Sequence, residues 1–208
     1  MNRNHIETAM NNLKIKHQIF HSEADFQFSL AWELQKILPD AKIHLEYCPL
    51  LDDSMHIDIY VLDEGHSHPI ELKYKTKELK APIGSEYYNL KNQFAHDIGR
   101  YDFLYDISRI EKMKTICDDF ASGFAIILTN DAAYWSSPCT NHTVDAAFRI
   151  HEGRFIAGCL SWSQKAGAGT TKGRHPFELN GSYKTTWLPF SDIGIPRGEF
   201  RYCMIEVK

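Results

Sequence analysis

The sequence lacks most of the features that mark secreted, membrane or zinc-thiolate proteins. Its five cysteines, among 208 residues, are odd in number and scattered, and no two form a CxxC pair. This usage is typical of reduced thiols that mostly fill a core in a reducing compartment. No apolar run resembles a signal peptide or is long enough to span a bilayer. We therefore expect a cytoplasmic protein with no membrane partner.

An excess of positive charge is also missing. The formal net charge is −4 and the isoelectric point is near 6.2, which argues against binding nucleic acid through bulk electrostatics. A local basic surface is still compatible with these totals, because steering depends on where the charges lie. A chain of 208 residues, of which 43% are hydrophobic, is enough for one substantial core. We expect a single domain over residues 1–208.

Two short runs of alternating apolar and polar residues stand on either side of a polar loop that contains Gly65. The first run, HIDIYVL, begins at His56, and the second, PIELKYK, ends at Lys75. Alternation over short runs around a glycine-containing loop predicts two antiparallel strands joined by a hairpin. This hairpin is the part of the chain on which the functional prediction depends.

The predicted hairpin brings Asp58, Glu71 and Lys73 together. If the loop centres on residues 64 and 65, position 58 faces position 71 and position 56 faces position 73. Two facing carboxylates about 5 Å apart repel each other unless a cation or a proton lies between them. Two carboxylates completed by waters suit Mg²⁺ or Mn²⁺, and the Lys73 ammonium could hold a phosphate oxygen or orient an attacking water. The combination predicts a phosphodiesterase site.

Asp58 followed by Glu71-Leu72-Lys73 resembles the D…(D/E)xK core of the PD-(D/E)xK nuclease superfamily, which has the restriction-endonuclease-like fold. The sequence departs from the full motif at Ile57, where the motif has proline. The resemblance implies that Asp58, Glu71 and the Leu72 carbonyl bind one or two Mg²⁺ or Mn²⁺ ions. It also implies that Lys73 orients the attacking water or helps to deprotonate it.

The resemblance further implies an acid on the first helix of the core, and Glu23 is the candidate. Ser22 and Asp25 have the spacing of a capping box, which predicts a helix that begins here and ends before Pro39. Glu23 lies on the edge of the stripe that should face the sheet. Two interpretations stay open: Glu23 completes the metal site, or it only complements the helix macrodipole in the first turn.

The remaining segments give an α/β element order. We expect a helix within residues 1–20, a strand over 42–50, a loop over 76–85, a helix from 85 to about 118 and a buried strand over 123–130. With the helix at Glu23 and the hairpin, the order matches the αβββαβ core of the restriction-endonuclease-like fold, with a mixed central sheet, over about 21–131. Strands are predicted at 146–150, 154–162, 183–189 and 200–207, which gives a β-rich C-terminal extension over about 140–208.

Five further polar residues are candidates for contact with nucleic acid or with the metal site. Lys75 and Lys77 follow the acid pair and either form a solvated face or meet phosphates. Lys172 and Arg174 lie in a glycine-rich stretch that is either a flexible surface loop or a loop that orders on a nucleic-acid backbone. Gln93 is a candidate donor to a water or to a metal ligand.

The sequence therefore predicts a Mg²⁺-dependent or Mn²⁺-dependent nuclease that hydrolyses DNA with metal-activated water. The alternatives are a catalytically inactive nuclease-fold module that binds nucleic acid and a protein-interaction module. DNA or RNA, single or double strands and internal or terminal cleavage all stay open. A homodimer is the expected arrangement if both strands of a duplex are cut, because that requires two sites.

Overall fold

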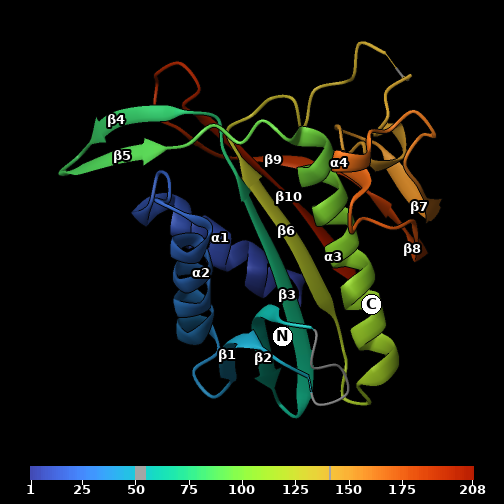
Figure 1. The fold of residues 1–208 in the computed structure, drawn as a ribbon. Helices are drawn as coiled ribbons and strands as arrows, with labels where there is room; N and C mark the ends of the chain where they lie inside the picture. The colour runs from blue at the N-terminus through green and yellow to red at the C-terminus, as the bar shows by residue number, and fades with distance from the viewer. Residues whose placement is uncertain (50–54, 141) are drawn as a thin grey trace.

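The computed structural model describes residues 1–49, 55–140 and 142–208, and its framework is a six-stranded mixed sheet (Figure 1). Across the sheet the strands are β1 (Lys42–Tyr47), β2 (Ile57–Asp63), β3 (His66–Lys75), β6 (Gly123–Thr129), β10 (Glu199–Val207) and β9 (Trp187–Asp192). β3 and β6 run parallel, and every other neighbouring pair is antiparallel. The predicted α/β class with a mixed central sheet is confirmed.

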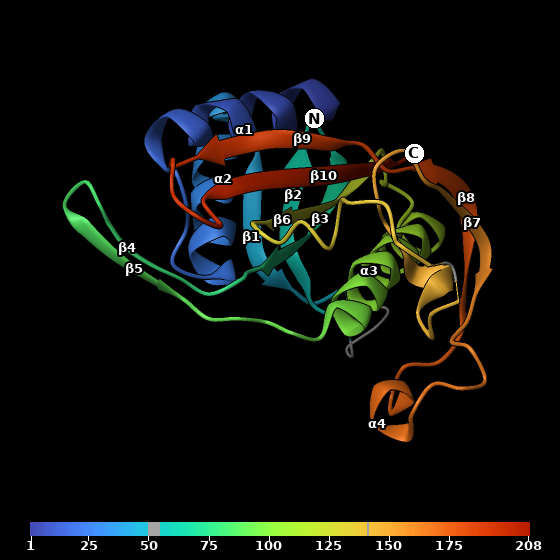
Figure 2. The same cartoon turned by 90° about the horizontal axis from the view of Figure 1, so that it is seen from above.

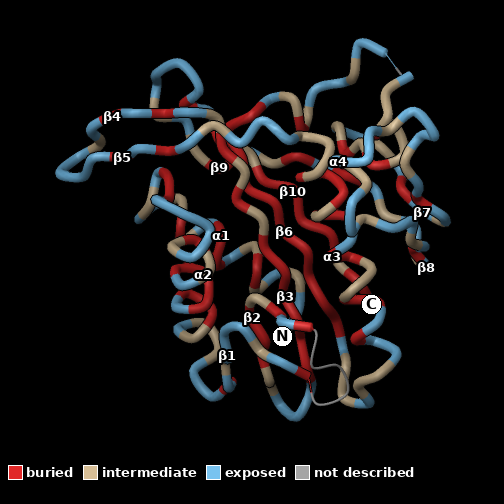
Figure 3. Tube along the Cα trace, in the orientation of Figure 1, coloured by how far each residue is buried: buried red, intermediate tan, exposed pale blue. Residues whose placement is uncertain are grey.

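Helices cover both faces of this sheet (Figure 2). One face carries α1 (Arg3–Lys16) and α2 (Glu23–Ile37), and the other carries α3 (His96–Ile116). Alternate residues of β6 enter the two cores: Ile126 packs in the core beneath α1 and α2, and Ile127 packs in the core beneath α3. Because β6 is buried on both faces (Figure 3), it needs the continuous apolar run that predicted a central strand.

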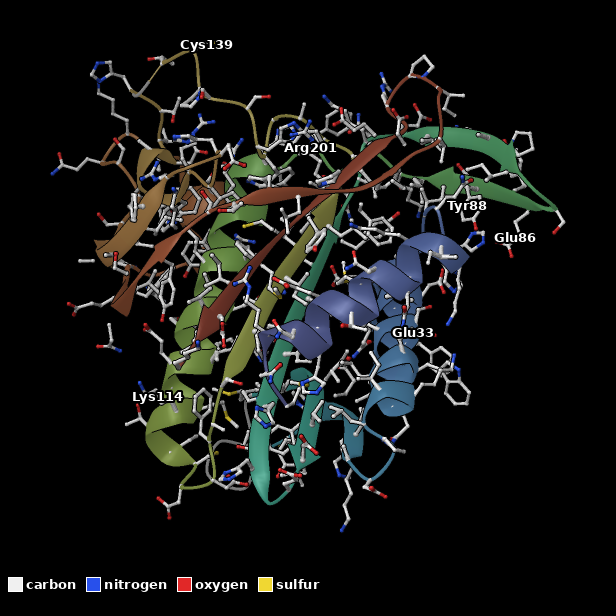
Figure 4. All side chains as sticks on the ribbon, turned by 180° about the vertical axis from the view of Figure 1, so that it is seen from behind. Glu33, Glu86, Tyr88, Lys114, Cys139 and Arg201 are labelled. Atoms are coloured by element: carbon white, nitrogen blue, oxygen red, sulfur yellow. The ribbon has the colours of Figure 1, made fainter. Side chains whose placement is uncertain are left out.

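α2 begins where the sequence predicts. The Ser22 hydroxyl accepts a hydrogen bond from the Asp25 amide at 3.1 Å, as an N-cap residue does. The Asp25 carboxylate accepts from the His21 amide at 2.8 Å, so the returning bond reaches one residue further back than in a capping box. Buried Glu33, labelled in Figure 4, ties α2 to α1 through an ion pair with Lys16.

The hairpin between β2 and β3 has the predicted register. Ile59 pairs with Ile70, and the turn is made by Glu64 and Gly65, which both have positive φ (50° and 79°). A two-residue turn of this kind matches the twist of the strands that it joins. The ladder ends at the Ile59–Ile70 pair, so positions 58 and 71, predicted to face each other, lie just beyond its last pair.

A second hairpin corrects the sequence prediction for residues 76–95. Its strands are β4 (Leu79–Ile83) and β5 (Glu86–Leu90), which pair only with each other and project from the side of the molecule (Figures 1 and 2). The loop predicted over 76–85 and the helix predicted from 85 are wrong here: Gly84, at φ 60°, makes a turn, and Tyr88 and Leu90 alternate inward at strand spacing. The helix α3 begins only at His96 and runs through Gly99 without a break.

The C-terminal third contributes to the central sheet as well as forming a separate extension. The extension contains η1 (Ala146–Phe148), β7 (Phe155–Leu160), α4 (Ala168–Thr171) and β8 (Phe177–Lys184). β7 and β8 form their own sheet against α3, whereas β10 and β9 continue the central sheet beyond β6. The strand predicted at 146–150 is wrong, because this segment makes a single 3₁₀ turn that buries Phe148. The strand predicted at 183–189 is divided between β8 and β9.

The cysteines agree only in part with the sequence prediction. None of the five forms a disulfide, but only Cys203 is buried, while Cys48, Cys139 and Cys159 are exposed. Three of the thiols are therefore not core residues. In the described part of the chain, no helix combines the length and apolar character needed to cross a membrane.

Candidate functional site

The candidate site begins where β3 extends beyond its pairing with β2. β2 and β3 last pair at Ile59 and Ile70, but β3 continues to Lys75 beside β6. Backbone N–H groups along the freed edge of β3 need other acceptors. The Leu72 amide donates to Asp58 Oδ2 at 2.6 Å, and the Tyr74 amide donates to Glu23 Oε2 at 2.6 Å.

Two carboxylates thus take the place of strand carbonyls on this edge. Asp58 comes from the start of β2 and Glu23 from the first turn of α2, where an acid complements the macrodipole. The side-chain amide of Gln27 donates to the Asp58 carbonyl at 2.6 Å and fixes α2 against β2. Both sequence-predicted acids therefore lie along the same edge of β3.

Glu71 and Lys73 meet side chains from α3. Leu72 and Tyr74 pack in the core beneath α1 and α2, so Glu71 and Lys73 point to the opposite face of the sheet. This face is covered by α3, whose Asp106 and Arg109 interact with them.

The contacts form one connected group of charges, which we call the acidic cluster: Asp58, Glu71 and Asp106 with the cations Lys73 and Arg109. Lys73 Nζ lies 2.5 Å from Asp106 Oδ2, and Arg109 Nη2 lies 3.2 Å from Glu71 Oε1. Arg109 also reaches Asp106 at 3.5 Å and donates to the His56 carbonyl.

Sequence reasoning missed Asp106 and Arg109. A signal for Asp106 was present, because it lies on the buried stripe of α3 with Phe103, Ile107 and Ile110. An acid on an apolar helical stripe is a buried charge that requires partners. Arg109, three residues further along the helix, is one of them.

Glu71 is the least satisfied member of the acidic cluster. Its exposed fraction is 1%, and although Arg109 forms an ion pair with it, neither carboxylate oxygen accepts a hydrogen bond from a described residue. Burial, then Asp106 and Asp58, raises the pKa of Glu71 well above its usual range, against the opposing effect of Arg109 and Lys73. Unpartnered buried oxygens of this kind are costly unless a cation or donor completes them.

Burial and neighbouring charges also have opposite effects on the pKa values of Asp106 and Lys73. Burial raises the pKa of Asp106 to about 6, although Lys73 and Arg109 lower it. Burial lowers the pKa of Lys73, but Asp106, Asp58 and Glu23 outweigh burial and raise it overall. Lys73 therefore stays an ammonium ion, which suits orienting a water or a phosphate oxygen and does not suit removing a proton.

The donors at this site fit a hard divalent cation. The oxygens of Glu71 accept no hydrogen bond from a described residue, although Arg109 forms an ion pair with one of them, and Asp58 lies beside Glu71. The Leu72 carbonyl accepts from Lys73 Nζ at 3.0 Å, which sets it in the same site. Within residues 1–49, 55–140 and 142–208, no three His, Cys, Asp or Glu side chains are grouped to hold a metal. Mg²⁺ does not require three, because it commonly binds one or two carboxylates and keeps several waters.

Three sequence-predicted residues line one pocket further along β3. Glu23, Lys75 and Gln93 surround a pocket of about 390 Å³, together with residues of β5. Gln93 is exposed, and its side-chain oxygen accepts from the Thr76 amide at 2.8 Å, so it holds the backbone after β3. In the described part of the chain Lys75 forms no ion pair and is available to this pocket.

The other basic candidates lie apart from the acidic cluster. Lys77 is paired with Asp131 at 3.0 Å, at the end of β6. Lys172 is exposed after α4, and Arg174 lies 3.8 Å from Asp102 of α3. α4 projects on the side of the molecule away from the β4–β5 hairpin (Figure 2). No described interaction joins Lys172 or Arg174 to the acidic cluster.

Comparison with protein-family models, with curated proteins and with solved structures found no match for this chain. Its likeness to the PD-(D/E)xK superfamily therefore depends on Asp58, Glu71, Lys73 and the order of the surrounding elements.

Proposed function

We propose that this chain is a metal-dependent nuclease of the PD-(D/E)xK type that hydrolyses phosphodiester bonds of DNA. The observation that carries the proposal is buried Glu71 beside Asp58 and Lys73: its oxygens accept no hydrogen bond from a described residue, and its one cationic contact is the ion pair with Arg109 at 3.2 Å. A protein gains little stability from such a group, and natural proteins retain unfavourable arrangements mainly at functional sites.

The order of the core elements supports the same proposal. α2, β1, β2, β3, α3 and β6 follow one another in the αβββαβ order, with the β4–β5 hairpin inserted before α3. In this order the acids have the positions that the restriction-endonuclease-like core would require: Glu23 on the helix, Asp58 on the second strand and Glu71 on the third. The assignment of that fold is part of the proposal.

Asp58, Glu71 and the Leu72 carbonyl would hold Mg²⁺ or Mn²⁺, with Glu23 further along the same edge of β3. A bound divalent ion supplies a water of lowered pKa and neutralises charge on the scissile phosphate. Lys73, held as an ammonium ion, orients the attacking water or a phosphate oxygen. Lys75, which lies on the adjoining pocket, contacts a neighbouring backbone phosphate. We further infer that the protein works in the cytoplasm with reduced thiols.

A second candidate, a catalytically inactive nuclease-fold module that binds nucleic acid or another protein, is favoured by a different observation. The ion pair of Arg109 with Glu71 occupies an acid that a metal would otherwise use, and the ion pair of Lys73 with Asp106 engages the lysine that would orient a water. If these ion pairs also form when the protein binds its partner, the acidic cluster only holds α3 against β3 and binds no metal.

Cleavage assays separate the two candidates. Single-stranded and duplex DNA and RNA are incubated with wild-type protein in Mg²⁺, in Mn²⁺ and in chelator. Asp58→Asn and Lys73→Met are assayed in the same way, with Asp102→Asn, at a half-buried acid of α3 outside the acidic cluster, as the control. We expect cleavage of DNA by wild type and by the control, only with metal, and a loss of at least 100-fold in the other two variants. Absence of cleavage of every substrate with both metals would reject the nuclease proposal in favour of the inactive module.

A further inference from the structure

A second group of charges, of which Arg100 and Asp145 are buried and Arg149 and Arg154 half-buried, lies between the first half of α3 and η1, away from the acidic cluster. It contains three arginines, Arg100, Arg149 and Arg154, which we call the arginine cluster, and one acid, Asp145. Arg100 Nη1 lies 2.6 Å from Asp145 Oδ2, and Arg149 Nη2 lies 3.3 Å from Asp145 Oδ1. In the described part of the chain Arg154 forms no ion pair, and its Nη2 donates to the Ala147 carbonyl at 3.1 Å.

The arginine cluster carries more positive charge than its surroundings neutralise. Arg100 and Arg149 share the Asp145 carboxylate and Arg154 forms no ion pair with a described residue, so the three guanidinium groups exceed this one carboxylate by two charges. Burial, and then Arg149, lowers the pKa of both Arg100 and Arg154, so the arginines repel one another. The side chain of Arg100 is only 5% exposed. Uncompensated charge at such a position destabilises the folded chain.

Several nitrogens of this group also lack hydrogen-bond acceptors. The Nε atoms of Arg100 and Arg149 are buried without a partner among the described residues, and so is Nδ1 of the neighbouring His151. Burial, followed by Arg154, Arg149 and Arg100, lowers the pKa of His151. The unpartnered N–H donors and the uncompensated positive charge of the arginine cluster would both be satisfied by a bound anion.

A pocket opens onto two of the three arginines. Its volume is about 230 Å³, and it is lined by Thr140, Thr143, Ala146, Arg149 and Arg154. The Thr143 hydroxyl accepts from Arg149 Nη2 at 3.0 Å, which holds that guanidinium at the pocket. The loop that carries Thr140 follows exposed Cys139, labelled in Figure 4.

We propose that this pocket binds a phosphate group between Arg149 and Arg154, with buried Arg100 supporting the charge from behind. Guanidinium groups suit phosphate because their fixed donors match its oxygens, and the uncompensated positive charge of the arginine cluster attracts an anion. The phosphate belongs either to a nucleic-acid backbone or to a small phosphorylated molecule. This site does not depend on the proposed nuclease activity, because it shares no residue with the acidic cluster.

A purely structural role accounts for only part of the arrangement. The bonds of Arg100 to Asp145 and to the Ala133 carbonyl fasten the loop before η1 to α3, and the bond of Arg154 to the Ala147 carbonyl fastens η1 to the segment before β7. Those bonds leave the excess charge and the unpartnered Nε atoms unexplained. The two roles differ in a measurable way: a structural arginine stabilises the protein without phosphate, whereas a binding arginine stabilises it only with phosphate.

Thermal unfolding in inorganic phosphate, against chloride at equal ionic strength, tests the proposal. The proteins are wild type, Arg149→Gln, Arg154→Gln, the charge-retaining Arg149→Lys and the control Lys184→Gln, an exposed cation on β8. We expect phosphate to raise the Tm of wild type and of the control. In the two Gln variants the apparent Kd for phosphate, taken from the rise in Tm, should be at least tenfold higher than in wild type, and their Tm in chloride should not be lower. The apparent Kd of Arg149→Lys should lie between that of the Gln variants and that of wild type.

A second arm identifies the source of the phosphate and separates this site from the nuclease proposal. Binding of a short DNA oligonucleotide is measured by fluorescence anisotropy in the same variants and in Asp58→Asn. Binding of the oligonucleotide that is lost in Arg154→Gln and kept in Asp58→Asn supports a nucleic-acid backbone as the ligand. A response to inorganic phosphate alone supports a small phosphorylated ligand. If neither ligand depends on Arg149 or Arg154, or if both Gln variants unfold at lower Tm in chloride, the proposal is wrong.

Discussion

Replacing Asp106 with Asn should stabilise the protein at alkaline pH. Asp106 is buried, with a side chain 5% exposed, and it shares the acidic cluster with Glu71 and Asp58. Lys73 at 2.5 Å and Arg109 at 3.5 Å attract its carboxylate. Burial nevertheless raises the pKa of Asp106 from 3.8 to about 6, so the folded protein favours the neutral acid.

The sign and size of the effect follow from that pKa. Because the pKa of Asp106 is higher in the folded state, its contribution to stability is present below pH 3.8 and is lost as the pH rises through about 6. A difference of one pKa unit corresponds to about 1.4 kcal/mol, and the pKa rises from 3.8 to about 6 on folding. The free energy of unfolding lost above pH 6 is therefore about 3 kcal/mol. Asparagine keeps the shape of the side chain and cannot ionise. The variant should therefore avoid this loss.

Urea unfolding at pH 4 and pH 8 measures the effect, with Asp102→Asn, at a half-buried acid of the same helix outside the acidic cluster, as a control. Asp106→Asn should exceed wild type by up to about 3 kcal/mol at pH 8, and the two proteins should be equal near pH 4. Breaking a stabilising buried ion pair instead costs about 3 to 5 kcal/mol. A loss of that size at pH 8 would refute the reasoning and identify the pair between Lys73 and Asp106 as a structural brace.

Three further predictions concern other parts of the fold. Burial lowers the pKa of His68 to about 4, so its contribution holds above pH 6.5 and is lost as the pH falls toward 4. Between pH 6.5 and pH 4 the free energy of unfolding of wild type should fall by about 3 kcal/mol more than that of His68→Gln. An equal dependence of the two free energies on pH would contradict this prediction. The exposed residue His44 provides the control substitution. Gly123→Ala should cost about 1 to 3 kcal/mol in urea unfolding, because a Cβ there would lie 2.2 Å from a methyl group of Ile110. Gly169→Ala, with nothing within 4 Å, should change stability little, and equal effects of the two substitutions would rule out close packing of α3 on β6. Finally, Mn²⁺ should raise the Tm of wild type but not that of Glu71→Gln, whose amide is a poorer metal ligand; equal shifts would exclude Glu71 as a ligand.

The parts of the fold that could be predicted from sequence are those fixed by local patterns. Alternation on both sides of Glu64 and Gly65 predicts the β2–β3 hairpin, and the two positive φ angles of that turn leave little freedom in the register. The apolar run of β6 and the Ser22 cap of α2 are equally local.

The β4–β5 hairpin could not be predicted in the same way. Its strands are five residues each and pair only with each other. Leu90, Phe94 and Ile98 follow one another at intervals of four residues, a spacing that also suits a helix. Phe94 in fact lies exposed before α3 begins. Whether β9 and β10 join the central sheet or the extension depends on contacts between distant parts of the chain, which a local pattern does not specify.

The candidate site likewise has one part that a local pattern predicts and one part that depends on tertiary packing. Asp58, Glu71 and Lys73 belong to one hairpin, so its register is sufficient to bring them together. Asp106 and Arg109 reach the acidic cluster only because α3 packs across β3, and that packing is a tertiary contact.

The most direct test of the central claim is Mn²⁺ binding by titration calorimetry in the presence of a short DNA oligonucleotide. Wild type is compared with Asp58→Asn and Glu71→Gln, with Asp102→Asn as the control. The account predicts saturable Mn²⁺ binding by wild type and by the control, with affinity reduced at least tenfold in the other two proteins. Equal binding by all four proteins, or no binding by any of them, would contradict a metal site at Asp58 and Glu71.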